Sequence, residues 1–123
     1  MLQVVAVMLM SQQALQPVAE GKASYYTLES SGTVTASGDT YDDALYTCAM
    51  RKGDFGDYFL VVADNGKSVV VRLNDRGPYA KGRVIDLSEA AMRKLQGTKS
   101  GVVNVKVYRL LHLQSALATV GLN

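Results

Sequence analysis

The chain has 123 residues, 48% of them hydrophobic, which is enough for one compact core and too little for two. Its formal net charge of +2, without a Lys- or Arg-rich run interleaved with aromatic residues, argues against a nucleic-acid partner. The single cysteine, Cys48, and the single histidine, His112, exclude an intramolecular disulfide and a cysteine-based metal cage, so we expect no metal and no cofactor.

Residues 1–20 have the character of an export signal. An apolar run from Val4 to Met10 is followed by small and polar residues, with a possible cleavage point after Ala19. The run is too short to span a bilayer, so we expect no stable membrane insertion. No basic residue precedes Lys22, and the alternative interpretation is a packed N-terminal helix. We therefore predict a signal-like or disordered segment over residues 1–20 of a secreted or periplasmic protein.

The next part of the chain alternates short β-type runs with turn residues. A strand is predicted after Gly21, followed by loops rich in Ser, Thr and Gly. Residues 41–51 predict a short helical turn, and the apolar run over residues 59–63 predicts a strand. Asn65-Gly66 then supplies the positive φ angles that a tight hairpin requires.

The remainder predicts three strands and one helix. The strands cover residues 68–73, 82–86 and 102–110, and Gly77-Pro78 must end the first of them. The helix covers residues 87–95, with Ser88 as its N-cap candidate and Glu89 in its first turn.

Strands dominate this pattern, and no βαβ alternation is present. The count and the short turns predict a mainly β fold: one barrel domain over residues 21–110, mostly antiparallel or mixed, with one or two short helices. A C-terminal tail over residues 111–123 would supply the second helix.

Two acids flank the Gly-Pro turn. Asp75, at the end of a predicted strand, is either a turn residue or a catalytic acid, because Asn-Asp before Gly-Pro is ordinary turn chemistry. Asp86 directly precedes the predicted helix, where a carboxylate satisfies free backbone N–H groups and the helix dipole. We therefore predict a structural role for Asp86.

Five motifs in chain order resemble the rare lipoprotein A family: GKASYY, TASGDTYDDAL, RKGDFG, NGKSVVVRLNDRGP and GRVIDLSEAA. They cover residues 21–110, and a more distant similarity links the chain to the barrel of expansins. The resemblance implies a six-stranded double-psi β-barrel with a polysaccharide groove over one side.

The resemblance also implies an activity. Members of the family are lytic transglycosylases that prefer peptidoglycan glycan strands stripped of their peptides. An acid protonates the glycosidic oxygen and then takes a proton from the C6 hydroxyl of the muramic residue, which leaves a 1,6-anhydro ring; one carboxyl can serve both steps. We therefore expect a cell-wall-associated monomer whose partner is the glycan strand.

Carried over by position, the family's essential aspartate falls on Asp75. A second functional carboxylate, Glu in the family, falls on Asp39 in Ser37-Gly38-Asp39. The family's histidine position holds Met50, which can neither donate nor accept a proton. This departure leaves two alternatives open: a non-catalytic or expansin-like wall-binding module, and a barrel reused for protein–protein contact.

Four further residues are predicted to bind substrate: Arg76, Tyr79, Arg72 and Tyr26. An arginine can hold sugar hydroxyls or the lactyl carboxylate of muramic acid, and a tyrosine ring can stack on a sugar. Cys48 is predicted to be a small buried hydrophobe rather than a nucleophile. His112 lies outside the matched motifs, and we assign it no role.

Overall fold

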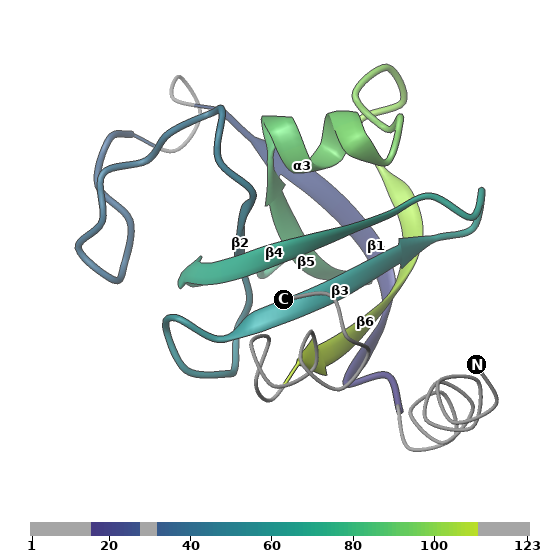
Figure 1. The fold of residues 1–123 in the computed structure, drawn as a ribbon, viewed down its shortest axis with the longest axis horizontal. Coiled ribbons are helices and arrows are strands. Elements are labelled where there is room, and N and C mark those ends of the chain that lie inside the picture. Colours follow the sequence, from purple (N-terminus) through teal and green to yellow (C-terminus); the bar gives the residue numbers. More distant parts are fainter. Residues whose placement is uncertain (1–15, 28–31, 111–123) are drawn as a thin grey trace, which may run out of the picture.

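The computed structural model describes residues 16–27 and 32–110, and their fold is a closed barrel of six strands (Figure 1). The strands are β1 (Ala19–Tyr26), β2 (Thr47–Ala49), β3 (Tyr58–Ala63), β4 (Ser68–Asp75), β5 (Arg83–Ser88) and β6 (Val103–Leu110). Around the barrel they follow the order β1-β5-β2-β4-β3-β6. The predicted mainly β, six-stranded barrel is confirmed.

The barrel mixes two kinds of strand pairing. β1 with β5, and β2 with β4, are parallel pairs, whereas the other four contacts around the barrel are antiparallel. Parallel neighbours need long crossover connections, so segments distant in the sequence become neighbours in space. The short strand β2 is inserted in this way between β4 and β5.

Most predicted strands lie where the sequence pattern places them. β3, β4, β5 and β6 each overlap the expected range. The predicted hairpin joins β3 to β4: the N–H of Ala63 donates to the carbonyl of Lys67, and Gly66 has a φ of 85°. The hairpin predicted from Asn65-Gly66 is therefore confirmed.

The predicted helical turn over residues 41–51 is wrong. This segment contains β2, which is only three residues long and hydrogen-bonds to β4 on one side and β5 on the other. The helix α3 (Glu89–Lys94) is also shorter than predicted, because Leu87 and Ser88 belong to β5. In both cases the pairing of a strand with distant neighbours overrides the local pattern.

The barrel begins before the predicted boundary at residue 21. Ala19 and Glu20 already pair with Val107 and Lys106 of β6, so the expected cleavage point after Ala19 falls inside β1. The rest of the signal-like segment, residues 1–15, and the tail over residues 111–123 lie outside the described residues. Within the described part of the chain, no helix is long and apolar enough to cross a membrane.

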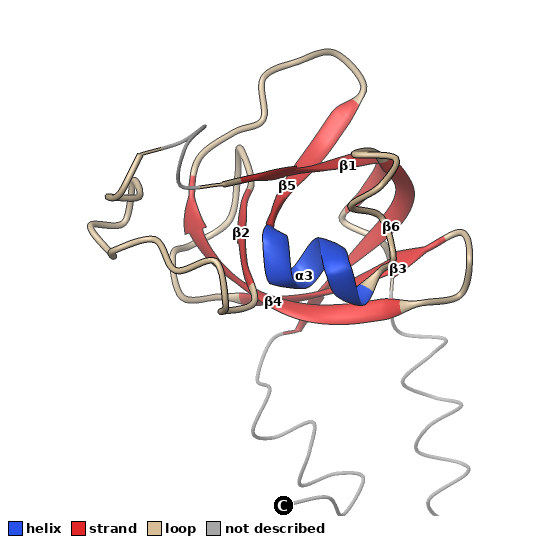
Figure 2. Cartoon of the chain, turned by 90° about the horizontal axis from the view of Figure 1, so that it is seen from above, coloured by secondary structure: helices blue, strands red, loops and turns tan. Residues whose placement is uncertain are grey.

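The interior of the barrel is a single apolar core, closed at one end by α3. Figure 2 shows the helix lying across the ring of strands. Ala91, Met92 and Leu95 are fully buried and pack into the same cluster as the inward-facing residues of the strands. The largest fully buried side chains on the strands are Leu73, Ile85, Leu87, Val61, Val71 and Val107.

Ser88, and not Asp86, caps α3. The Ser88 Oγ accepts a hydrogen bond from the N–H of Ala91, which confirms the predicted N-cap. The same oxygen accepts from the N–H of Thr47 at 3.2 Å and donates to the carbonyl of Leu45 at 2.7 Å. One fully buried hydroxyl therefore joins the helix, β2 and the loop before β2.

Replacing Ser88 with alanine should lower the free energy of unfolding by about 2–3 kcal/mol, because the cap is lost and buried polar groups of β2 and its loop lose their partner. Urea unfolding measures this change. The matched control is Ser68→Ala at the exposed start of β4, which we expect to change stability by less than about 0.5 kcal/mol. An equal effect of the two substitutions would contradict the role of Ser88.

Candidate active site

Asp75 is the last residue of β4, and two backbone donors fix its side chain. Its Oδ1 accepts hydrogen bonds from the N–H groups of Ala36 and Arg76, both at 2.9 Å. Gly77 then turns the chain with a φ of 119°, a conformation that favours glycine. The Asp75 carboxylate is therefore held in a defined position at the end of a strand.

Asp75 and Asp86 flank Ala49 across three neighbouring strands. Ala49 pairs with Asp75 on β4, after a register shift between Cys48 and Ala49, and with Asp86 on β5; Asp86 in turn pairs with Ser24 on β1. Residues in register lie side by side on the same face of a sheet. Cys48, the neighbour of Ala49 along β2, points into the core, so the row points out of the barrel. We call these four residues, Ser24, Asp86, Ala49 and Asp75, the acid row.

Asp86 has a different environment from the one we predicted. Its Oδ1 accepts a hydrogen bond from the Ser24 hydroxyl at 3.0 Å, and the capping role expected of it belongs to Ser88. Burial raises the pKa of Asp86, and the charge of Asp75 adds to this, while the Ser24 hydroxyl and Arg83 act in the opposite direction. Asp86 therefore belongs to the candidate site and not to the helix end.

Asp39 forms an ion pair with Arg72. The Arg72 Nη1 lies 2.9 Å from the Asp39 Oδ2, and this hydrogen bond is the main reason that the pKa of Asp39 is lowered. The loop that carries Asp39 is docked on the end of β4, where the N–H of Ser37 donates to the carbonyl of Asn74. Asp39 is thus suited to accept hydrogen bonds from hydroxyl groups rather than to donate a proton.

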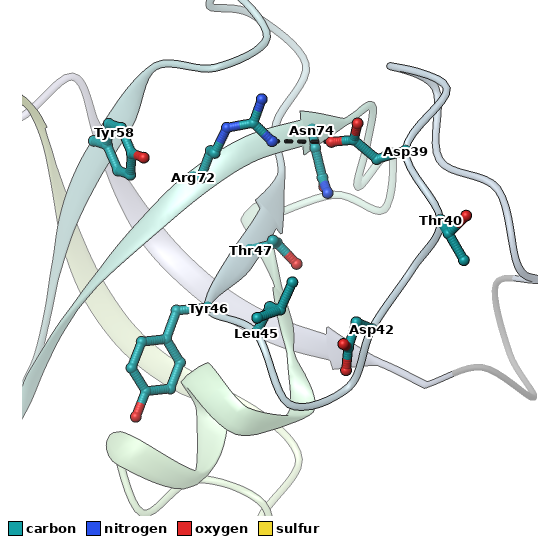
Figure 3. Close-up of a pocket in the computed structure, with 9 residues that line it drawn as sticks. All are labelled: Asp39, Thr40, Asp42, Leu45, Tyr46, Thr47, Tyr58, Arg72 and Asn74. Carbon is teal, nitrogen blue, oxygen red and sulfur yellow. Dashed lines mark hydrogen bonds and ion pairs between the residues drawn. The ribbon is translucent and has the colours of Figure 1, made fainter.

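The ion pair lines an open cleft of about 460 Å³. Figure 3 shows the pair meeting beside Asn74, with Tyr46 and Tyr58 on the opposite side of the view from Thr40. The two tyrosines are 43% and 36% exposed, so their rings are accessible from the cleft. Polar side chains between exposed aromatic rings suit a sugar, which has apolar faces and hydroxyl edges.

The sequence analysis named Asp39 and Arg72 among the residues that line this cleft, and it missed Tyr46, Tyr58 and Asn74, among others. The Asn74 Oδ1 is buried and has no hydrogen-bond partner among the described residues, which makes it a candidate contact for a polar ligand group. Tyr58 pairs directly across the β3–β4 ladder with Arg72. The available signal was this register, since the hairpin at Gly66 places position 58 opposite position 72.

The two tyrosines predicted to bind substrate differ in their exposure to solvent. Tyr26 is only 5% exposed and packs against Tyr41 with ring centroids 4.8 Å apart, so it cannot present a face to a sugar. That prediction is wrong, because the outer side of β1 is covered by the loop that carries Tyr41. Tyr79 is 75% exposed beside Gly77, and a contact with substrate remains a prediction.

The guanidinium of Arg76 is bound to other groups of the protein. Its two terminal nitrogens donate to the carbonyls of Met50 at 3.3 Å and Gly53 at 2.8 Å, and its guanidinium lies 4.3 Å from the ring centroid of Phe55. These contacts tie the loop after β2 to the turn after β4. Arg76 therefore acts on the site by holding this loop, and Arg72 is the arginine that faces the cleft.

Met50 occupies the position of the family's histidine, but its side chain can neither donate nor accept a proton. Its side chain belongs to the apolar core, while its N–H donates to the carbonyl of Asp75 at 3.2 Å. Cys48 is fully buried, and burial raises the pKa of its thiol, as expected for a core residue. His112 lies outside the described residues, among which no group of three or more His, Cys, Asp or Glu is arranged to hold a metal ion.

A family model described as "Lytic transglycolase" matches residues 18–107 of this chain. The chain belongs to this family. A protein of Treponema pallidum named "Probable endolytic peptidoglycan transglycosylase RlpA" is 47% identical over 93 residues, which are 75% of this chain and 29% of the relative. The Pasteurella multocida "Endolytic peptidoglycan transglycosylase RlpA" is 44% identical over 98 residues, 79% of this chain and 33% of the relative. The chain thus spans about a third of the length of these relatives.

Solved structures agree with the fold of this lytic transglycolase domain. The "Streptomyces papain inhibitor (SPI)" superposes with a TM-score of 0.59 at 27% identity, over 74% of this chain and 91% of that one. An expansin of Clavibacter michiganensis superposes with a TM-score of 0.56 at 22% identity, over 74% of this chain and 49% of that one, a likeness of fold alone. The predicted RlpA-like double-psi barrel is therefore confirmed.

The raised pKa of Asp86 has a consequence for stability. Folding favours its protonated form, so its contribution is fully present below the pKa of the unfolded side chain and is lost as the pH rises through the folded pKa. Asp86→Asn is neutral at every pH and should gain stability relative to the wild type from about pH 4 upward. Urea unfolding at a series of pH values tests this. An unchanged difference from pH 4 to pH 8 would contradict it, and exposed Asp64→Asn is the control.

The contacts of Arg76 predict a structural effect. Arg76→Ala should lower the free energy of unfolding by about 1–2 kcal/mol, because two hydrogen bonds and the contact with Phe55 are lost. Hydrogen exchange of residues 50–56 should become faster. Arg51→Ala, at an exposed position in the same loop, is the control and should have almost no effect. Unchanged exchange in Arg76→Ala would show that the loop does not depend on this side chain.

Proposed function

We propose that this chain is a lytic transglycosylase that cleaves the glycan strands of peptidoglycan, preferentially strands without stem peptides, and leaves 1,6-anhydro-muramic ends. The observation that carries the proposal is Asp75, a carboxylate fixed by two backbone N–H groups on the outer face of the barrel. The match of the lytic transglycolase family over residues 18–107 and the names of the curated relatives support it.

The reaction needs two proton transfers at one bond. A proton must reach the glycosidic oxygen as its bond to C1 breaks, and a base must take the proton of the C6 hydroxyl as that oxygen bonds to C1. No water is consumed, so the proton gained balances the proton lost, and a single carboxyl can perform both steps in turn. We assign both steps to Asp75, the position on which the family's essential aspartate falls.

The cleft beside Asp75 provides the binding surface for the strand. The loop that carries Asp39 also donates the N–H of Ala36 to Asp75, so a sugar chain bound at the Arg72–Asp39 pair would lie near Asp75. The tyrosine rings at positions 46 and 58 offer stacking faces beside the ion pair. Asp39 thus assists by orienting sugar hydroxyls, and its partner Arg72 fixes its direction.

This function belongs outside the cytoplasm, where peptidoglycan is found. The curated relatives are named peptidoglycan transglycosylases, and the apolar run from Val4 to Met10 fits an exported protein. The partner is the glycan strand itself, bound by a single barrel acting as a monomer.

Purified protein incubated with peptide-free glycan strands should produce anhydro-ended fragments, detected by mass spectrometry. Asp75→Asn should reduce their rate of formation by roughly a hundredfold or more, since the variant can neither donate nor accept the proton. Asp64→Asn changes the same group at the exposed β3–β4 hairpin, far along β4 from the site, and should leave the rate unchanged.

Two outcomes would overturn parts of the proposal. Equal activity in wild type and Asp75→Asn, with both folded by urea unfolding, would remove Asp75 from the reaction. Strands that bind in a sedimentation assay without any anhydro product would favour the wall-binding module instead. The observation that favours this second function is Met50, which occupies the family's histidine position and is buried in the core.

A further inference from the structure

A second open cleft, of about 440 Å³, lies at the other end of β2 from the Arg72–Asp39 pair. Thr47, the first residue of β2, lines the cleft of that ion pair. Met50 follows the last residue of β2 and lines the second cleft, and its N–H donates to the carbonyl of Asp75 at 3.2 Å. Asp75 therefore lies between two clefts along one strand.

The second cleft is apolar apart from two cations. Its lining consists of Val18, Ala19, Met50 and Val84, which are apolar, and of Arg51 and Lys52. No carboxylate is among the described residues that line it. We call it the basic cleft.

Neither cation of the basic cleft has a partner for its charge among the residues that the structure describes. The ion pairs formed there use Arg72, Arg93 and Arg109. Arg51 and Lys52 are both exposed. A cleft whose charges have one sign concentrates the field between its walls and attracts ligands of the opposite sign.

A neighbouring cleft restricts the place of such a ligand. It also contains Lys52, but Asp54 and Asp57 are among its lining residues. Because carboxylates repel an anion, the negative group of a ligand belongs on the side of Lys52 that carries Arg51.

The basic cleft is close to the reacting bond. Arg51 is two residues beyond Ala49, which limits the separation of their Cα atoms to about 7 Å. Ala49 is in turn one strand spacing, about 5 Å, from Asp75. Neighbouring sugars of one glycan strand can therefore contact Asp75 and Arg51 together.

The proposed substrate carries an anion that fits this cleft. Each muramic residue has a lactyl group on C3, and in a strand without stem peptides this group ends in a free carboxylate. In a strand with stem peptides the same carboxyl is a neutral amide. The two kinds of strand thus differ in charge at a fixed place on the muramic residue.

We propose that the basic cleft binds the lactyl carboxylate of a muramic residue near the cleaved bond, and that Arg51 and Lys52 thereby determine the preference for strands without stem peptides. This inference rests on the proposed function. The guanidinium of Arg51 can donate two parallel hydrogen bonds to a carboxylate, and Lys52 adds a second positive charge. The apolar lining accommodates the methyl group of the lactyl chain.

The test compares two forms of one substrate. Peptide-free glycan strands are used as such, or after their lactyl carboxylates have been converted to neutral N-methylamides. Wild-type kcat/KM should be roughly three- to tenfold lower on the amidated strands, because a charged contact at an exposed position is lost. Sedimentation measures the binding of both forms in parallel.

The double variant Arg51→Gln/Lys52→Gln should act on both forms at the rate that wild type shows on amidated strands. Loss of the cations and loss of the carboxylate then remove the same contact, so their effects do not add. Arg51→Lys/Lys52→Arg, which conserves both charges, should keep most of the preference. In about 1 M salt, where exposed charges are screened beyond about 3 Å, the wild-type preference should weaken.

The matched control is Lys67→Gln/Lys99→Gln, which removes the same number of charges at exposed positions. The hairpin that carries Lys67 contacts the end of α3, where the Asn65 Nδ2 donates to the carbonyl of Leu95, whereas the basic cleft lies at the start of β5. This control should keep the wild-type preference. Urea unfolding confirms that each variant is folded.

The two measurements separate this inference from the proposed function. A wild type that forms no anhydro ends, but binds free-carboxylate strands more tightly than amidated ones through Arg51 and Lys52, overturns the proposed function and supports the basic cleft. An active wild type that does not distinguish the two forms overturns the inference alone. So does a folded Arg51→Gln/Lys52→Gln that keeps the wild-type preference. A wild type that neither cleaves nor binds the strands overturns both.

Discussion

The candidate site depends on where one three-residue strand is placed. β2 pairs in parallel with β4 and antiparallel with β5, and it brings the ends of these two strands to either side of Ala49. Asp75 and Asp86 are eleven residues apart, separated by a turn with the cis Gly77-Pro78 bond. Without β2 between them, no backbone ladder would set their spacing.

The surrounding loops hold this arrangement through a few polar contacts at the ends of strands. Ser88 joins β2 to the start of α3, and Arg76 joins the loop after β2 to the turn after β4. The loop carrying Asp39 docks by backbone hydrogen bonds on the end of β4. The apolar core stabilises the barrel as a whole, whereas these contacts position the side chains of the candidate site relative to one another.

The sequence predicted most of the fold and part of the site. The alternation of apolar residues predicted β3, β4 and β6, and Asn65-Gly66 predicted the hairpin, because both patterns depend only on neighbouring residues. β2 was mistaken for a helical turn, since a three-residue strand carries almost no periodic signal. Asp86 was assigned to the helix end because an acid before a helix normally caps it, and its pairing with Ser24 across 62 positions cannot be read from spacing.

The sequence by itself determined two things. Its long central motif identified the family, and it placed a carboxylate at the end of β4. Only the tertiary structure decided which side chains share the site. It placed Asp86 and Ser24 in the acid row, buried Tyr26, occupied Arg76 with a loop and opened the cleft lined by Tyr46 and Tyr58. The physical reason is the crossed connectivity of the barrel, because strands distant in the sequence set the register that brings these groups together.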